Sequence, residues 1–223
     1  MAVEPEAGRR VSVRLVMLGP PGAGKGTQAE RFARARQVPR ISTGDVLRQA
    51  RIGSPELERR ARATMDAGRL VEDDLVIGIV RDRLVEPDAK HGFVLDGFPR
   101  TLTQAEALDL LLDDRQPLIV VDIEVPEETL VERLRTRRIC GKCGTPAVSG
   151  LAACASCGGP LVQRSDDELR VVQERLRVYA RESQPIVEFY RRRPSFRSVD
   201  GDQPLESVAA DISAAVASVV GAR

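Results

Sequence analysis

Gly19-Pro-Pro-Gly-Ala-Gly-Lys-Gly-Thr27 follows the apolar run Val13–Leu18 and precedes a helix-like segment, residues 28–36. A strand, a glycine loop and a helix in this order are the context in which a phosphate-binding loop occurs. Glycines let backbone N–H groups approach a polyphosphate closely, and the helix points its positive N-terminus at the same place. Lys25 can reach the outer phosphates as a mobile charge. The strict motif has Ser or Thr directly after the lysine, whereas Gly26 stands there in this chain. The alternative interpretation is a glycine-rich turn with a chance lysine.

Size and charge argue against several classes of protein. The chain has 223 residues, enough for one large or two small domains, and its net charge of +1 gives no field that favours nucleic acid or an anionic membrane. Trp is absent and aromatic residues make up 3% of the chain, which argues against a platform for stacking single-stranded bases. No apolar run approaches the roughly 20 residues that span a bilayer. We expect residues 1–11 to be a disordered tail and the protein to be cytoplasmic.

Apolar runs alternate with helical patterns along the chain, which favours an α/β fold with a parallel central sheet flanked by helices. The expected strands are 11–18, 38–42, 93–96, 117–123 and 196–199. The expected helices are 24–36, 42–51, 56–67, 73–84, 101–112, 126–137, 166–190 and 205–220. Pro185 is expected to kink the helix over 166–190, and we detect no internal repeat. Gly19 and Asp96 both lie at strand ends, where such sheets bind ligands, so the loop and this carboxylate should meet.

Four cysteines form two Cys-x-x-Cys pairs separated by ten residues: Cys140, Cys143, Cys154 and Cys157. Two such turns can present four thiolates as a tetrahedron, which suits a structural Zn²⁺ and leaves no open position for substrate. Redox-active pairs and idle thiols are the alternatives. Redox pairs usually open a helix after a strand, whereas these pairs lie in glycine-rich turns. His91, the only histidine, is distant in sequence and is not expected to bind metal.

Several further segments, taken together with the glycine loop, resemble the adenylate kinases. They are Ser42-Thr-Gly-Asp-Val-Leu-Arg48, Asp66-Ala-Gly-Arg-Leu-Val71, Leu95-Asp-Gly-Phe-Pro-Arg100 with Gln104, and Arg164-Ser-Asp-Asp167 with Arg175. The resemblance covers nearly the whole chain, and the Lys-Gly-Thr form of the loop belongs to it. It implies the fold of the P-loop nucleoside monophosphate kinases, with an inserted helical monophosphate-binding lobe and a zinc-knuckle lid. The implied core is 12–41, 72–136 and 168–223, the implied lobe is 42–71, and the implied lid is 137–167.

The resemblance also implies an activity, the reversible Mg²⁺-dependent transfer of the terminal phosphoryl group of ATP to AMP, which gives two ADP. The residues implied to bind ATP are Gly22, Ala23, Gly24, Lys25, Gly26, Thr27, Arg133, Arg137 and Gln203. The residues implied to bind AMP are Thr43, Arg48, Arg69, Leu70, Val71, Gly97, Phe98, Pro99, Arg100, Gln104, Arg164 and Arg175. The residues implied to act in catalysis are Lys25, Asp96, Arg100, Arg137, Arg164 and Arg175. Asp96 would hold Mg²⁺, Asp166 and Asp167 would help to latch the lid, and the Phe98–Pro99 bond would be cis.

The residues themselves suit this chemistry. The acceptor is a phosphate that is already ionised, so the reaction needs no general base, and catalysis consists mainly of positioning and neutralising phosphoryl oxygens. A lysine, several arginines and Mg²⁺ meet that need, and a lid that closes would exclude water as the competing acceptor. We therefore expect ATP, AMP and ADP as ligands, with Mg²⁺ and a structural Zn²⁺. We expect a monomer that binds neither nucleic acid nor a membrane.

The lid departs from the family pattern. The spacing between its cysteine pairs is shorter than usual, and Ala147-Val148 stand where an aromatic residue and a histidine commonly follow the first pair. Which lid residues contact the nucleotides, beyond Arg133, Arg137 and Arg164, therefore stays an open question. Two alternatives also stay open: a kinase for another nucleoside monophosphate, and a nucleotide-binding module without useful turnover. The arginine set argues against the second alternative, because a binding module has no use for charges aimed at a transferred group.

Overall fold

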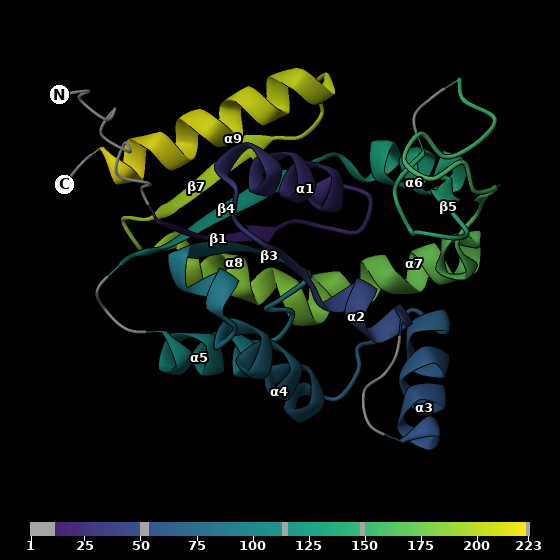
Figure 1. Ribbon diagram of the computed structural model, residues 1–223, viewed down its shortest axis with the longest axis horizontal. Helices are drawn as coiled ribbons and strands as arrows, with labels where there is room; N and C mark the ends of the chain where they lie inside the picture. Colours follow the sequence, from purple (N-terminus) through teal and green to yellow (C-terminus); the bar gives the residue numbers. More distant parts are fainter. Residues whose placement is uncertain (1–11, 50–53, 113–115, 148–149, 222–223) are drawn as a thin grey trace, which may run out of the picture.

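A five-stranded parallel sheet runs through the centre of the molecule, in the strand order β2-β3-β1-β4-β7 (Figure 1). The computed structural model describes residues 12–49, 54–112, 116–147 and 150–221, so the tail expected at 1–11 lies outside the described residues. The strands are β1 (Val13–Leu18), β2 (Arg40–Ser42), β3 (Gly92–Asp96), β4 (Leu118–Glu124) and β7 (Phe196–Asp200). All four pairings between them are parallel, which confirms the expected fold class.

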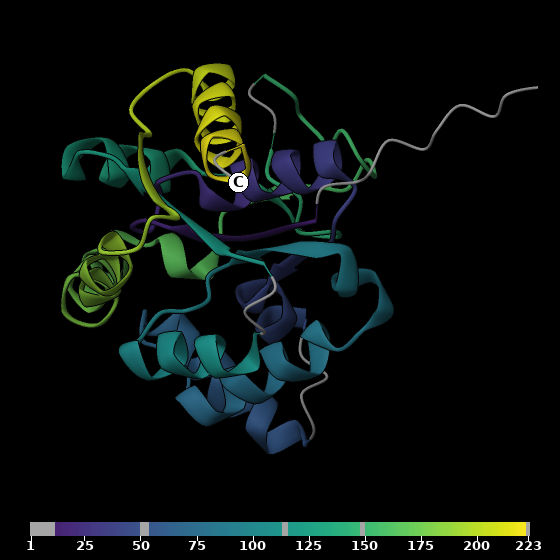
Figure 2. The same cartoon turned by 90° about the vertical axis from the view of Figure 1, so that its left-hand side faces the viewer.

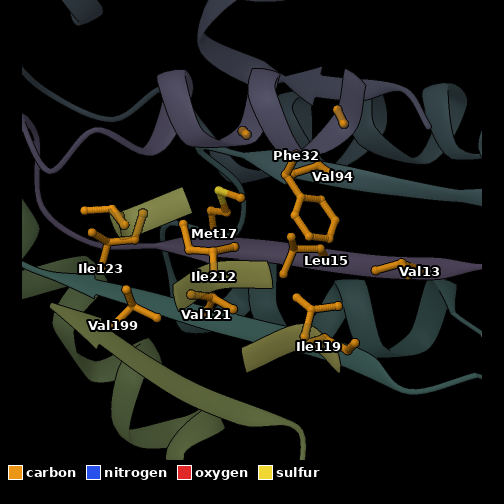
Figure 3. Packing of buried hydrophobic residues seen from close by; sticks show 14 of the residues in the cluster. Val13, Leu15, Met17, Phe32, Val94, Ile119, Val121, Ile123, Val199 and Ile212 are labelled. Atoms are coloured by element: carbon orange, nitrogen blue, oxygen red, sulfur yellow. The ribbon is translucent and has the colours of Figure 1, made fainter. Parts of the chain in front are cut away.

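Helices cover both faces of this sheet (Figures 1 and 2). One face is covered by α1 (Lys25–Arg36) and α9 (Leu205–Val220), and the other by α4 (Asp73–Leu84), α5 (Leu102–Leu111) and α8 (Gln184–Arg191). Leu15 and Met17 pack toward Phe32 and Ile212 in the first core (Figure 3), whereas the alternate residue Val16 belongs to the second. Because side chains alternate along a strand and neither face meets water, an uninterrupted apolar strand is favoured here.

Two small lobes lie at the carboxyl end of the sheet (Figure 1). The first contains α2 (Thr43–Gln49) and α3 (Pro55–Asp66). The second, which is the segment expected to form the lid and is called the lid below, follows α6 (Glu127–Thr136), contains the short strands β5 (Ile139–Cys140) and β6 (Leu161–Val162), and leads into α7 (Leu169–Val178). Within the ranges that the structure describes, no helix is both long and apolar enough to cross a membrane.

Thr101 caps a helix as its sequence predicts, whereas a second predicted helix is interrupted. Thr101 accepts a hydrogen bond from the N–H of Gln104 and caps α5, as expected. The helix predicted over 166–190, with a kink at Pro185, is confirmed from Leu169 onward, where α7, a π turn (Tyr179–Ser183) and α8 follow one another; its expected first residues form a 3₁₀ turn (Ser165–Asp167) instead. Pro185 lacks an N–H, so it lies in the first turn of α8 directly after the π turn. The helix expected over 42–51 is described as far as Gln49, and its remainder lies outside the described residues.

Gly92 and Gly78 offer a test of how the backbone of β3 constrains the sequence. Gly92 has φ +121°, and a β-carbon there would lie 2.6 Å from the carbonyl oxygen of Val13, whereas a β-carbon at Gly78 in α4 would meet nothing within 4 Å. We expect Gly92→Ala to lower the free energy of unfolding by about 1–3 kcal/mol through strain and overpacking. Gly78→Ala should raise it by roughly 0.5–1 kcal/mol, because alanine is the better helix former. Urea denaturation followed by circular dichroism measures both, and equal midpoints for Gly92→Ala and the wild type would contradict the account.

Candidate active site

The glycine loop has the backbone that its sequence predicts. Gly19, Gly22 and Gly24 all have positive φ, at +132°, +91° and +91°. A β-carbon at Gly19 would lie 2.6 Å from the carbonyl oxygen of Ile123, so only glycine fits at that close approach to β4. The N–H of Ala23 closes the turn onto the carbonyl of Pro20 at 3.1 Å, and α1 begins two residues later. The helix N-terminus therefore opens into the space beyond the strand ends, where anions are favoured.

Lys25 lies across this loop. Its Nζ donates hydrogen bonds to the carbonyl oxygens of Gly19 and Pro20, at 2.7 and 2.8 Å. Burial lowers the pKa of Lys25 to about 7; nearby Asp96 opposes the shift, and the positive charges of Arg100, Arg175 and Arg137 add to it. An anion at this place would favour the charged form of the lysine.

Two cavities lie side by side at the carboxyl end of the sheet. The larger, about 530 Å³, lies between the glycine loop, α2 and the lid, and the smaller, about 100 Å³, lies between the loop, α3 and α7. Both are lined by the same five cations: Lys25, Arg48, Arg100, Arg164 and Arg175. A ligand in either cavity can therefore contact charges that also face the other.

The larger cavity collects most residues expected to bind the donor. These are Gly22, Gly24, Lys25, Gly26, Thr27, Arg133 and Arg137, together with Asp96. Ala23 is buried within the loop. The Arg133 side chain also lies 3.5 Å from Asp202. Gln203 is not among the residues that line either cavity, and its amide donates to the Asp200 carbonyl and to Asp211.

Two buried carboxylates hold three of the arginines. Asp167 accepts from Nε and Nη2 of Arg137, at 2.8 and 2.5 Å, and from Nη1 of Arg175 at 3.1 Å. Asp166 makes a two-bond pair with Arg164, at 2.8 and 2.7 Å. Burial lowers the pKa of Arg175 to about 10; Asp166 opposes this, and repulsion from Arg137 and Arg164 adds to it. The predicted latch acids thus lie within the cation cluster itself.

The smaller cavity collects part of the set expected to bind the acceptor. Arg48, Arg69, Leu70, Gly97, Pro99, Arg100, Arg164 and Arg175 line it. The Phe98–Pro99 bond is cis, as the resemblance implied, and Gly97 has φ +81°. Through this turn Thr43 Oγ1 and Arg100 Nε both donate to the carbonyl of Gly97, each at 2.9 Å.

Four expected acceptor residues lie outside the cavity linings: Thr43, Val71, Phe98 and Gln104. Gln104 is 1% exposed, and its amide is occupied on both sides. Its Oε1 accepts from the N–H of Arg100 at 2.8 Å, and its Nε2 donates to Asp73 at 2.7 Å. In this state Gln104 fixes the backbone of Arg100.

The four cysteines come together within the lid. Their Sγ atoms all lie within 4.8 Å of one another, and adjacent pairs are 3.4–3.6 Å apart. Zn–S bonds of about 2.3 Å in a tetrahedron correspond to S–S separations of about 3.8 Å, so the sulfur positions suit zinc. The same separations are too long for disulfide bonds, in which the S–S distance is about 2.05 Å. The N–H groups of Lys142 and Cys143 both point to the Sγ of Cys140, at 3.3 and 3.4 Å.

An internal repeat is present in the lid, which corrects the expectation that there was none. The Cys-x-x-Cys-Gly-x-Pro segments that begin at Cys140 and Cys154 make equivalent backbone hydrogen bonds, Gly144 N–H to Cys140 and Gly158 N–H to Cys154, both at 2.9 Å. Gly144 and Gly158 both have positive φ, at +75° and +68°. The seven-residue pattern was present in the sequence and could have revealed the repeat.

The sequence predictions missed Arg40, Asp45, Tyr179 and Ser183. Arg40 and Asp45 line the larger cavity, and Tyr179 and Ser183, from the π turn, line the smaller one. Ser183 Oγ donates to the carbonyl of Arg100 at 2.9 Å. In a chain so rich in arginine, Arg40 carried no signal of its own, and the kink expected at Pro185 did not indicate that Tyr179 and Ser183 face a cavity.

Comparison with known proteins gives one family. The family profile described as adenylate kinase matches residues 17–195. An adenylate kinase of Archaeoglobus fulgidus is 47% identical over 212 residues, which cover 91% of this chain and 97% of that protein. An adenylate kinase of Moorella thermoacetica is 48% identical, covering 88% of this chain and 94% of that protein, and one of Methanocella arvoryzae is 44% identical, covering 92% and 98%.

The lowered pKa of Lys25 predicts a pH dependence of stability. The group binds a proton with a pKa near 10.5 when unfolded and about 7 when folded, so between these values the unfolded chain holds more protons and folding is favoured as pH rises. The wild type should therefore gain thermal stability relative to Lys25→Met between about pH 7 and pH 10. Melting temperatures of both proteins across that range test this. A constant difference between the two proteins would contradict the buried position of the ammonium group.

Proposed function

Because the chain belongs to the adenylate kinase family, we propose that its two cavities bind the two nucleotides of that reaction end to end. The protein is a phosphotransferase that converts ATP and AMP reversibly into two ADP. We assign ATP to the larger cavity and AMP to the smaller one. The observation that supports this assignment is the set of five cations lining both cavities, since a transferred group must be neutralised from both sides.

On the donor side, we assign the phosphates of ATP to the loop from Gly22 to Thr27. Positive φ at Gly22 and Gly24 and the N-terminus of α1 support this assignment. Lys25 would exchange its two carbonyl contacts for phosphate oxygens, which is a low-barrier change for a flexible chain. Arg133 at the end of α6 would face the adenine, and Gln203 remains a proposed backbone contact to it.

On the acceptor side, we assign the phosphate of AMP to Arg48 and Arg100. Both arginines have a pKa lowered by burial, so an anion beside them would relieve an unfavourable environment. Arg69, Leu70 and Val71 would border the nucleoside. We assign Thr43, Phe98, Pro99 and Gln104 to holding the turn that carries Arg100.

We propose that the transferred group meets Arg137, Arg164 and Arg175 as well as Lys25. No side chain is needed as a base, because the acceptor is already an anion. What these residues supply is in-line positioning and charge that is in place before transfer. Closure of the lid, residues 137–167, over the core would exclude water.

Asp96 and Thr27 provide oxygen ligands that suit Mg²⁺, and both line the larger cavity. When bound with ATP, Mg²⁺ supplies charge neutralisation at phosphate oxygens. We assign Zn²⁺ to Cys140, Cys143, Cys154 and Cys157, whose sulfur separations and N–H···S contacts suit it.

Because a single chain provides every proposed contact, we propose a monomer. The closely spaced free thiols suit a reducing compartment, the cytoplasm.

Substrate choice is tested by ADP formation from MgATP with AMP, CMP, UMP or GMP. We expect Lys25→Met and Arg100→Ala each to lower kcat/KM for AMP by about 100-fold or more, because each removes charge from the transition state. Arg177→Ala is the matched control: this arginine lies on α7, its side chain is 70% exposed, and it pairs with Glu174. Wild-type rates in both site variants, with the fold intact, would overturn the assigned roles.

Removal of zinc should affect stability more than ligand contacts. The lid has few buried apolar residues, so the metal would supply much of its folding free energy. We expect chelation, and Cys154→Ser, to lower the melting temperature while AMP still binds. Calorimetry measures the melting temperature, metal analysis measures the zinc content, and a titration measures the binding of AMP. Loss of AMP binding without loss of stability would show that the metal acts at the substrate site instead.

A further inference from the structure

Arg40, the first residue of β2, lies between two acidic side chains at the edge of the larger cavity. Its Nη2 donates to Oδ2 of Asp96 at 2.7 Å and to Oδ2 of Asp45 at 2.9 Å. Glu30 approaches its Nη1 at 3.6 Å. The Arg40 side chain is 22% exposed and that of Asp96 is 11% exposed, so the pair is poorly screened by water. The register of β2 on β3 fixes this arrangement, because Ser42 pairs with Asp96.

Gly26 shows that the glycine loop and this ion pair are packed as one unit. A β-carbon at Gly26 would lie 3.3 Å from Asp96 Oδ2 and 3.4 Å from Arg40 Nη2. Those distances are tighter than usual, so a side chain between Lys25 and Thr27 would press on the ion pair. The guanidinium thus lies on the oxygen that faces the loop, beside the proposed phosphate position.

This places a fixed positive charge on the carboxylate to which we assign Mg²⁺. A divalent cation that approaches Asp96 competes with Arg40 for the same oxygen and is repelled by its charge. Asp45 accepts from Arg40 on the other side and also from Arg48 at 2.6 Å, so a second carboxylate helps to hold the guanidinium beside Asp96. The charges alternate along Asp96, Arg40, Asp45 and Arg48.

We propose that Arg40 is a positioning residue that weakens and thereby sets the affinity of Asp96 for the divalent cation, so that the metal is held with nucleotide and released with it. The inference rests on the proposed assignment of Mg²⁺ to Asp96. The effect comes from the positive charge of Arg40 and not from the shape of its side chain. A neutral residue at position 40 should therefore tighten cation binding, whereas lysine should leave it unchanged.

The test uses a two-headed ligand, a dinucleoside pentaphosphate with adenosine at both ends, titrated by calorimetry into the full chain with Mg²⁺ or with EDTA. The ratio of Kd in EDTA to Kd in Mg²⁺ measures how much the cation favours binding. The affinity of Mg²⁺ for the free ligand is common to every variant, so differences between variants come from the protein. We expect this ratio to rise at least threefold in Arg40→Gln and to stay at the wild-type value in Arg40→Lys.

Arg31→Gln is the matched control, because Arg31 lies on α1 and pairs with the exposed Glu206. If Arg40→Gln does not fold, Arg40→Met is the second neutral variant. An unchanged or smaller ratio in a folded neutral variant would overturn the inference. The variant Asp96→Asn distinguishes a failure of this inference from a failure of the proposed assignment of Mg²⁺ to Asp96. A wild-type ratio in Asp96→Asn would mean that Mg²⁺ is held elsewhere, whereas a lowered ratio there with no effect at Arg40 would refute the role of Arg40 alone.

Discussion

The pairing of Asp166 and Asp167 with three arginines is the interaction on which the rest of the site depends. Arg137, Arg164 and Arg175 converge in a half-buried space, where burial and repulsion from the other two arginines lower the pKa of Arg175. Two carboxylates in one 3₁₀ turn offset that repulsion and fix the guanidinium planes. Lys25 and Arg100 instead donate to backbone carbonyls, which carry no net charge. The cleft is therefore stable as a fold and still attracts anions.

Much of the fold and part of the site could be predicted from the sequence, for identifiable reasons. Strands such as β1, apolar except for Arg14, are mostly apolar because both faces are covered, and the glycines of the loop need positive φ that other residues avoid. The Cys-x-x-Cys spacing predicted that the four cysteines come together, and the sequence around Thr101 predicted the cap of α5. Pro185 signalled an irregularity in the helix over 166–190, but its form, a π turn over Tyr179–Ser183, has no periodic pattern in the sequence. Arg40 escaped notice because its role depends on Asp96, which is distant in the sequence and is brought beside Arg40 by the register of β2 on β3.

The lid shows how a short segment can hold its shape without a core. Leu151 and Val162 are exposed, and backbone turns rather than apolar packing organise the two cysteine knuckles. Gly159 lies so close that a β-carbon would be 2.8 Å from the Sγ of Cys140, whereas Thr145, at the equivalent place in the first knuckle, accepts from Cys143 at 3.2 Å. The repeat is therefore not symmetric around the sulfurs, and residues between the cysteines shape the cluster as much as their spacing does.

The 3₁₀ turn over Ser165–Asp167 also connects the lid to the lobe formed by α2 and α3. Ser165 Oγ donates to Asp66 at the end of α3 at 2.7 Å, and a β-carbon at Gly68 would lie 3.1 Å from Arg175. The lobe that borders the smaller cavity is thus in contact with the turn that carries Asp166 and Asp167. A movement of the lid that shifts this turn must act on the arginines and on the lobe together. Donor and acceptor would then be enclosed by one motion, because both are bounded by the same five charges.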